Sequence, residues 1–154
     1  MGKNKQIPFP QADDMSKIFK IINIDNSDDL KNTASMQIVL GDISSRQVQY
    51  YLDAAAFLSI IDEKKEFTSF GINLRKLNTY EQKILVAQKI VSNDVFGEVY
   101  FSELILGVKL EKEEIVSLMK NKVKFNSNEI YNRRAQTVLK WVEWINLNDE
   151  RFKV

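Results

Sequence analysis

The chain has 154 residues and a net charge of +1, and its composition, 44% hydrophobic and 28% charged, is that of an ordinary globular protein. It contains neither cysteine nor histidine, which excludes disulfides, thiol or imidazole catalysis, and metal sites built on those side chains. No apolar run is long enough to span a bilayer, so we expect a cytoplasmic protein without a membrane segment.

The first half of the chain predicts three helices followed by a hairpin. Residues 1–11 contain both prolines and no hydrophobic period, which is typical of an extended arm. Gly41 should end the second helix, and the Ser44 to Gln47 spacing of a capping box should open a long third helix. A turn at Asp42 and Ile43 has the length that a helix-turn-helix uses. We therefore expect a winged-helix module over residues 12–78, with wing strands at 59–61 and 66–70.

The second half, residues 79–154, predicts a helix-turn-helix module without a wing. Thr79 and Gln82 again have capping-box spacing, and residues 94–97 should break the helix that follows. Too few residues follow the last helix for a hairpin. The fold class expected is mainly α, two tandem helix-turn-helix modules of which the first carries a short β-hairpin. The expected helices are 12–23, 33–40, 44–60, 80–92, 99–106, 111–121 and 129–147.

The long helices of the two halves resemble each other. Residues 46–58 read RQVQYYLDAAAFL and residues 133–145 read RRAQTVLKWVEWI, so that Arg46 aligns with Arg133 and an apolar stripe recurs in both. The stripe predicts that the following residues are buried: Val48, Tyr51, Leu52, Ala55, Leu58, Val138, Leu139, Val142 and Ile145. Phe57 and Trp144 fall outside the stripe, and we expect them to pack between the modules or against a partner.

These segments resemble the winged-helix modules attached to bacterial restriction endonucleases and related defence proteins. The resemblance rests on Arg46-Gln47, Tyr50-Tyr51, Ala54-Ala55 and Thr68 to Gly71, and on Arg133 to Ile145 with both tryptophans. It spans roughly residues 12–146. In such proteins the region accompanies a nuclease, and no nuclease domain is visible in this sequence.

The candidate interface is the polar side of the two long helices together with the wing turn. Arginine and glutamine at the start of a recognition helix suit guanine and adenine edges. An ordinary solvated helix face explains the same residues equally well, and Arg134 could instead stack in the structure. The candidate DNA-binding residues are Ser45, Arg46, Gln47, Gln49, Tyr50, Lys64, Lys65, Arg133, Arg134, Gln136, Thr137 and Lys140.

Catalysis finds little support in the sequence. Asp42 with Asp62-Glu63-Lys64, or with Glu63 and Lys65, matches the letters of a nuclease motif that binds Mg²⁺, but the acids fall in a turn. We expect no catalytic residue, cofactor or metal.

The sequence therefore predicts a non-catalytic protein that binds double-stranded DNA in a bacterial restriction-modification or phage-defence system. A homodimer and a nuclease or methyltransferase partner fit that setting. The alternative is a winged-helix docking module that serves as a subunit or adaptor of a nuclease complex, which the near-neutral charge favours.

Overall fold

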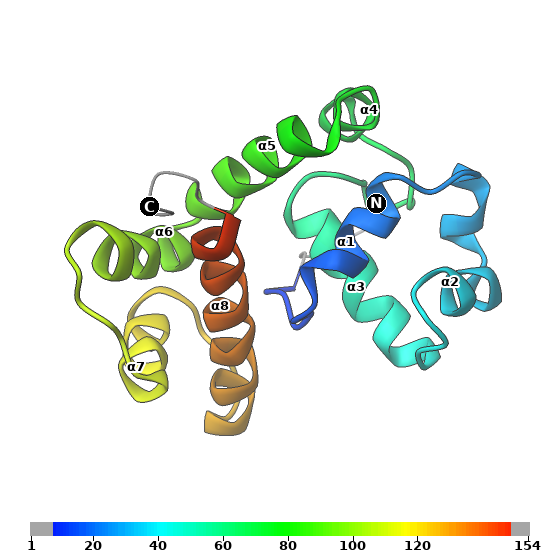
Figure 1. The fold of residues 1–154 in the computed structure, drawn as a ribbon. Coiled ribbons are helices and arrows are strands. Elements are labelled where there is room, and N and C mark those ends of the chain that lie inside the picture. The colour runs from blue at the N-terminus through cyan, green and yellow to red at the C-terminus, as the bar shows by residue number, and fades with distance from the viewer. Residues whose placement is uncertain (1–7, 149–154) are drawn as a thin grey trace, which may run out of the picture. The chain divides into compact units, whose positions relative to one another are not determined.

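The computed structural model describes residues 8–148, which fold almost entirely into helices (Figure 1). The elements are α1 (Met15–Ile22), the 3₁₀ helix η1 (Ser27–Lys31), α2 (Thr33–Val39), α3 (Ser45–Phe57), α4 (Ser69–Arg75), α5 (Thr79–Val91), α6 (Asp94–Tyr100), the π-helical segment η2 (Phe101–Ile105), α7 (Lys112–Lys122) and α8 (Asn128–Asn148). The chain divides into two compact units, unit 1 (Met1–Gln82) and unit 2 (Lys83–Val154), and the division falls within α5. The prediction of a mainly α protein is confirmed.

In unit 1, α3 packs against both α1 and α2 (Figure 1). Each of the three helices starts at a polar cap, and Ser44 accepts a hydrogen bond from the Gln47 backbone N–H, which is one of the two bonds of the predicted capping box. Val48, Leu52 and Ala55 of α3 are almost completely buried. Tyr51 lies on the same buried side, and its hydroxyl accepts a hydrogen bond of 3.1 Å from the Asp14 backbone N–H. Burial raises the pKa of Tyr51. The inner face of α3 is therefore fixed in its register against α1.

The connection between α2 and α3 is tight and closed by hydrogen bonds. Gly41 has φ +93°, and its N–H donates to the Ile38 carbonyl, while the Asp42 N–H donates to the Gln37 carbonyl. These are the two bonds of a Schellman motif, which satisfy the last carbonyls of a helix. The predicted stop at Gly41 is confirmed.

The predicted wing strands do not form. Within residues 8–148, the β structure is one antiparallel bridge between Ile61 and Phe67. The strand predicted at 66–70 fails because Thr68 caps α4: its Oγ1 accepts from the Gly71 N–H at 3.0 Å and donates to the Ser59 and Ile60 carbonyls. From Ser69 onward the chain is therefore helical.

Gly71 brings α4 against the segment that follows α3. A Cβ atom at this position would lie 2.1 Å from the Ile60 carbonyl oxygen, so a side chain has no room there. Thr68 and Gly71, two of the residues that carry the resemblance, therefore hold α4 against the segment after α3.

Two predictions at the start of the second half need correction. The cap of α5 is Asn78, whose Oδ1 accepts from the Glu81 N–H. Gln82 is buried and instead hydrogen-bonds Asn23 and the Leu74 carbonyl. The helix predicted at 80–92 does end at Val91, but residues 94–97 begin α6 instead of forming the break, because the Asn93 side chain caps the Val95 and Phe96 N–H groups.

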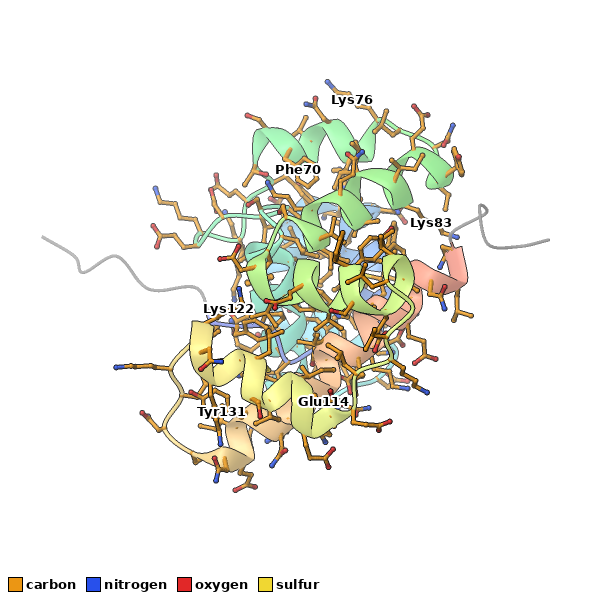
Figure 2. The ribbon with its side chains drawn as sticks, turned by 90° about the vertical axis from the view of Figure 1, so that its left-hand side faces the viewer. Phe70, Lys76, Lys83, Glu114, Lys122 and Tyr131 are labelled. Atoms are coloured by element: carbon orange, nitrogen blue, oxygen red, sulfur yellow. The ribbon has the colours of Figure 1, made fainter. Side chains whose placement is uncertain are left out.

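In unit 2, α8 packs against both α6 and α7. Figure 2 shows Tyr131 beside the connector that joins α7 to α8, and its hydroxyl bonds to that connector, donating to the Val123 carbonyl and accepting from the Phe125 N–H. Trp141 is completely buried and stacks on Phe96 of α6 with 5.0 Å between ring centroids. The aromatic pair forms the centre of this unit's core.

The predicted core is confirmed with one exception. Leu139 is only half-buried, whereas the other eight predicted residues are buried. Because α8 is covered by two helices, its buried face is wider than the predicted stripe and takes in Ala135, Thr137 and Trp141. Among the described residues, none of the helices is both long enough and apolar enough to cross a membrane.

Candidate nucleic-acid interface

The start of α3 presents the predicted polar residues to solvent. Ser45, Arg46, Gln47 and Gln49 are exposed, and Tyr50 is half-buried. In a helix-turn-helix, the first turn of the second helix is the part that meets base edges in the major groove. The opposite side of α3 is packed on α1 and α2, so this polar face is held in one orientation.

Hydrogen bonds between successive turns order the side chains on this face. The Arg46 Nε donates to the Tyr50 hydroxyl at 2.6 Å, and the guanidinium lies 5.6 Å from the Tyr50 ring centroid. The two terminal nitrogens of the guanidinium carry four further N–H donors, enough for a bidentate contact. Gln49 donates to the Asp53 carboxylate at 2.8 Å. Arg46, which is held by Tyr50, and Gln47 are therefore the exposed side chains of the first turn that could contact a base.

The charge of unit 1 is low for a surface that meets phosphate. Residues 1–82 contain ten lysines and arginines and eleven acidic residues, a net charge of −1. Arg46 is the one cation in α3, and Asp42 and Asp53 lie near it in the sequence. Nonspecific attraction to a duplex, which scales with phosphate contacts, should consequently be small.

The two lysines of the turn after α3 lie in different surroundings. Lys64 is exposed, whereas Lys65 is half-buried, has φ +61°, and lines a groove with residues of η1 and α4. No residue of α3 lines this groove. The structure therefore does not bring Lys65 into one site with Arg46.

The polar face predicted on α8 is only partly present. Arg133 and Lys140 are exposed and Gln136 is half-buried. Thr137 is completely buried, which removes it from any surface. The Arg134 guanidinium lies 4.5 Å from the Phe125 ring centroid, the stacked structural role that the sequence left open. Arg133 is the sixth residue of α8, whereas Arg46 is the second of α3, so the two arginines occupy different positions along their helices.

Phe57 is half-buried and packs in part against the start of the chain. Phe9, at the end of the predicted arm, is buried and meets the Phe57 ring edge-on with 5.6 Å between centroids. Phe57 thus has one aromatic neighbour within unit 1, and the rest of its half-buried ring leaves the expected packing between modules or against a partner as a prediction. Trp144 is half-buried.

The acidic residues of the turn serve the backbone. The Asp62 carboxylate accepts hydrogen bonds from the Lys64 and Glu66 N–H groups, at 2.9 and 3.0 Å. Across residues 8–148, no three acidic side chains come together as a metal-binding cluster would require.

Sequence reasoning missed Arg75. Its guanidinium donates to the Ile22 and Ile24 carbonyls at 2.7 and 2.8 Å, and it lies 4.6 Å from the Phe67 ring centroid. It thereby joins α4 to the end of α1. Arg75 and Lys76 form a pair of cations at a helix end, and that pair alone gives no sign that Arg75 bonds to carbonyls more than fifty residues earlier in the chain.

The sequence matches one family over residues 12–149, and that family is described as "Domain of unknown function (DUF7226)". No curated protein and no solved structure matches the chain.

Proposed function

The chain belongs to this family of unknown function, and we propose that it is a non-catalytic DNA-binding protein in which α2, the turn and α3 act as a helix-turn-helix. The observation that carries the proposal is the exposed, polar first turn of α3, which follows a tight closed turn and lies on a helix fixed from behind. Arg46 would contact guanine or phosphate, and Gln47 would contact a neighbouring base edge.

The resemblance of residues 46–71 to modules of restriction and defence proteins supports a setting in the bacterial cytoplasm beside a nuclease or methyltransferase. Unit 1 has a net charge of −1 and therefore needs a further source of phosphate contacts. A partner enzyme, or a second copy of this chain on a neighbouring half-site, would supply phosphate contacts that unit 1 lacks.

The test is selection of bound sequences from pooled duplexes, followed by titration at two salt concentrations. Arg46→Ala should lose roughly 1–3 kcal/mol of binding free energy and relax one base position if Arg46 reads guanine. If it contacts phosphate, binding to all sequences should weaken and the salt slope should fall by about one unit. Arg46→Lys separates the two cases, because lysine keeps the charge and loses the fork of donors.

Lys20→Ala is the matched control, since Lys20 is an exposed cation of the same unit on α1. Arg133→Ala tests whether α8 contributes. If the wild type binds no duplex at low salt, or if Arg46→Ala behaves like Lys20→Ala, DNA binding by α3 is excluded.

A docking role is the second candidate, and one observation favours it. Phe101, Ile105, Leu106 and Val108 are each about half exposed or more and follow one another along η2 and the loop after it. Clusters of exposed large apolar residues commonly mark interaction sites. Under this proposal the occupant is a nuclease or methyltransferase partner. Leu106→Ser should then reduce co-purification of the two proteins after co-expression, whereas exposed Ser117→Ala should not.

A further inference from the structure

Unit 1 contains a groove of about 430 Å³ that the proposed DNA contact does not use. Three segments distant in sequence form it: η1, the turn after α3, and the C-terminal end of α4. All three belong to unit 1, and the start of α3 takes no part in the lining.

The groove has an apolar surface held in a fixed position. Phe67 lines it, with the Arg75 guanidinium 4.6 Å from the ring centroid. Arg75 is itself held by its two hydrogen bonds to the backbone at the end of α1. Ile72 of α4 also lines the groove and is 47% exposed. An aromatic ring and an aliphatic side chain therefore remain available to an apolar group of a ligand.

The surroundings of that apolar surface are basic. Four cations and two acids line the groove, and Lys31 pairs with Glu66 at 3.2 Å. The ammonium groups of Lys65 and Lys76 have no ion-pair or hydrogen-bond partner within residues 8–148. The Lys76 side chain extends from the end of α4 into solvent (Figure 2). A ligand that carries negative charge would neutralise these two lysines.

Three consecutive backbone N–H groups of the turn are already bonded within the turn and do not face a ligand. The N–H groups of Lys64 and Glu66 donate to the Asp62 carboxylate, and the N–H of Lys65 donates to the Asp62 carbonyl. Phosphate sites in loops are commonly built from such N–H groups when they are unsatisfied. Ser27 and Asp28 add a hydroxyl and one carboxylate to the lining, and the cations without a partner in the described part of the chain are the ammonium groups of Lys65 and Lys76. Ammonium groups on long, flexible side chains suit carboxylates at the edge of an apolar contact.

We propose that this groove binds an acidic peptide segment of a partner protein, one apolar side chain lying against Phe67 and Ile72 and flanking carboxylates facing Lys65 and Lys76. Specificity would come from the pairing of both features, because neither a purely acidic nor a purely apolar segment satisfies the surface. The proposal rests on the groove alone and holds whether or not α3 binds DNA.

The experiment uses the ¹⁵N-labelled full chain and follows the backbone amide signals of the groove during titration. The probes are acetylated, amidated peptides Glu-Glu-X-Glu in which X is leucine, methionine or phenylalanine. Gln-Gln-Leu-Gln lacks the charge and Glu-Glu-Gly-Glu lacks the apolar side chain. We expect the acidic apolar peptides to shift the signals of Phe67, Ile72 and Lys76, and the two control peptides to have little effect.

Variants then test the two lysines. The double variant Lys65→Gln, Lys76→Gln should weaken peptide binding by roughly tenfold, since two charge pairs at a partly exposed site are lost. Lys64→Gln is the matched control, because Lys64 neighbours Lys65 on the same turn but does not line the groove. Its peptide affinity should equal that of the wild type.

Several results would overturn the proposal. If no acidic apolar peptide shifts the groove signals at millimolar concentration, or if the double variant binds as the wild type does, the groove is not a peptide site. If inorganic phosphate or duplex DNA shifts the same signals more strongly than the peptides, the lysines serve phosphate instead.

Discussion

Gly71→Ala tests the closest backbone approach in unit 1. The added Cβ would lie 2.1 Å from the Ile60 carbonyl oxygen and 3.0 Å from a Phe67 ring carbon, whereas ordinary contacts begin near 3.4 Å. To relieve this contact, α4 must move away from the Ile60 carbonyl by about 1 Å. That movement stretches the bonds of Thr68 to the Ile60 carbonyl and to the Gly71 N–H.

The magnitude follows from opposing effects. Overpacking costs about 1–3 kcal/mol, and each hydrogen bond that is lost costs about 1 kcal/mol. Alanine gains about 1 kcal/mol over glycine inside a helix. The free energy of unfolding should therefore fall by about 3 kcal/mol, measured by urea titration with far-UV circular dichroism.

Ser69→Ala is the control, since Ser69 is exposed on the same helix and its substitution should change stability by less than about 0.5 kcal/mol. If Gly71→Ala is as stable as the wild type or more stable, helix propensity outweighs the contact and α4 does not lie this close to the Ile60 carbonyl.

Three further substitutions test separate features of the fold. Ser59 has φ +61°, so Ser59→Gly should raise the urea midpoint through a gain of about 1 kcal/mol, whereas Ser59→Ala, which keeps the strain, should not. Trp141→Ala should cost about 3–5 kcal/mol by removing the buried stack on Phe96, and a loss below 1 kcal/mol in thermal unfolding would contradict that packing. For Asp14, burial raises the pKa but hydrogen bonds from Ser16 and the charge of Lys17 lower it more, so the net pKa lies below its ordinary value of 3.8. The stability that this carboxylate contributes is present above pH 3.8 and is lost as pH falls through the lowered pKa. Asp14→Ala should therefore lower the free energy of unfolding by about 1 kcal/mol at neutral pH, and the difference from the wild type should become smaller in acid. A difference that does not change with pH would refute the role of the Asp14 carboxylate as a charged cap.

The helices could be predicted because their signals are local. Periodic apolar residues and the caps at Ser44 and Gly41 lie within one or two turns of the element that they define. The wing could not be predicted correctly, because alternating residues at 66–70 fit a strand equally well. The competing cap at Thr68 gains its strength from carbonyls nine and eight residues earlier.

The buried face of α8 shows why a stripe alone misassigns residues. Leu139 fits the predicted stripe, yet α6 and α7 together cover a face centred on Trp141 and extending to Thr137. The width of a helix's buried face depends on how many other helices pack on it, and this cannot be read from the sequence of that helix alone.

One part of the candidate site could be predicted from the sequence, and another part could not. The exposed first turn of α3 was predicted from its position after the turn, which is a local property. The groove was not predicted, because Lys31, Lys65 and Lys76 belong to three segments that only the tertiary structure brings together. The role of Arg75 as a bond donor to α1 was missed for the same reason.

The position of the two tryptophans gives the protein a built-in optical reporter. Trp141 and Trp144 are the only tryptophans of the chain, and both lie in α8 of unit 2. Tryptophan fluorescence therefore follows the unfolding of unit 2, whereas the circular dichroism of the helices follows both units. Coincident transitions would identify one cooperative folding unit, and separate transitions would identify two. Because the chain has no cysteine, a single cysteine introduced into unit 1 could carry a second fluorophore without competing thiols.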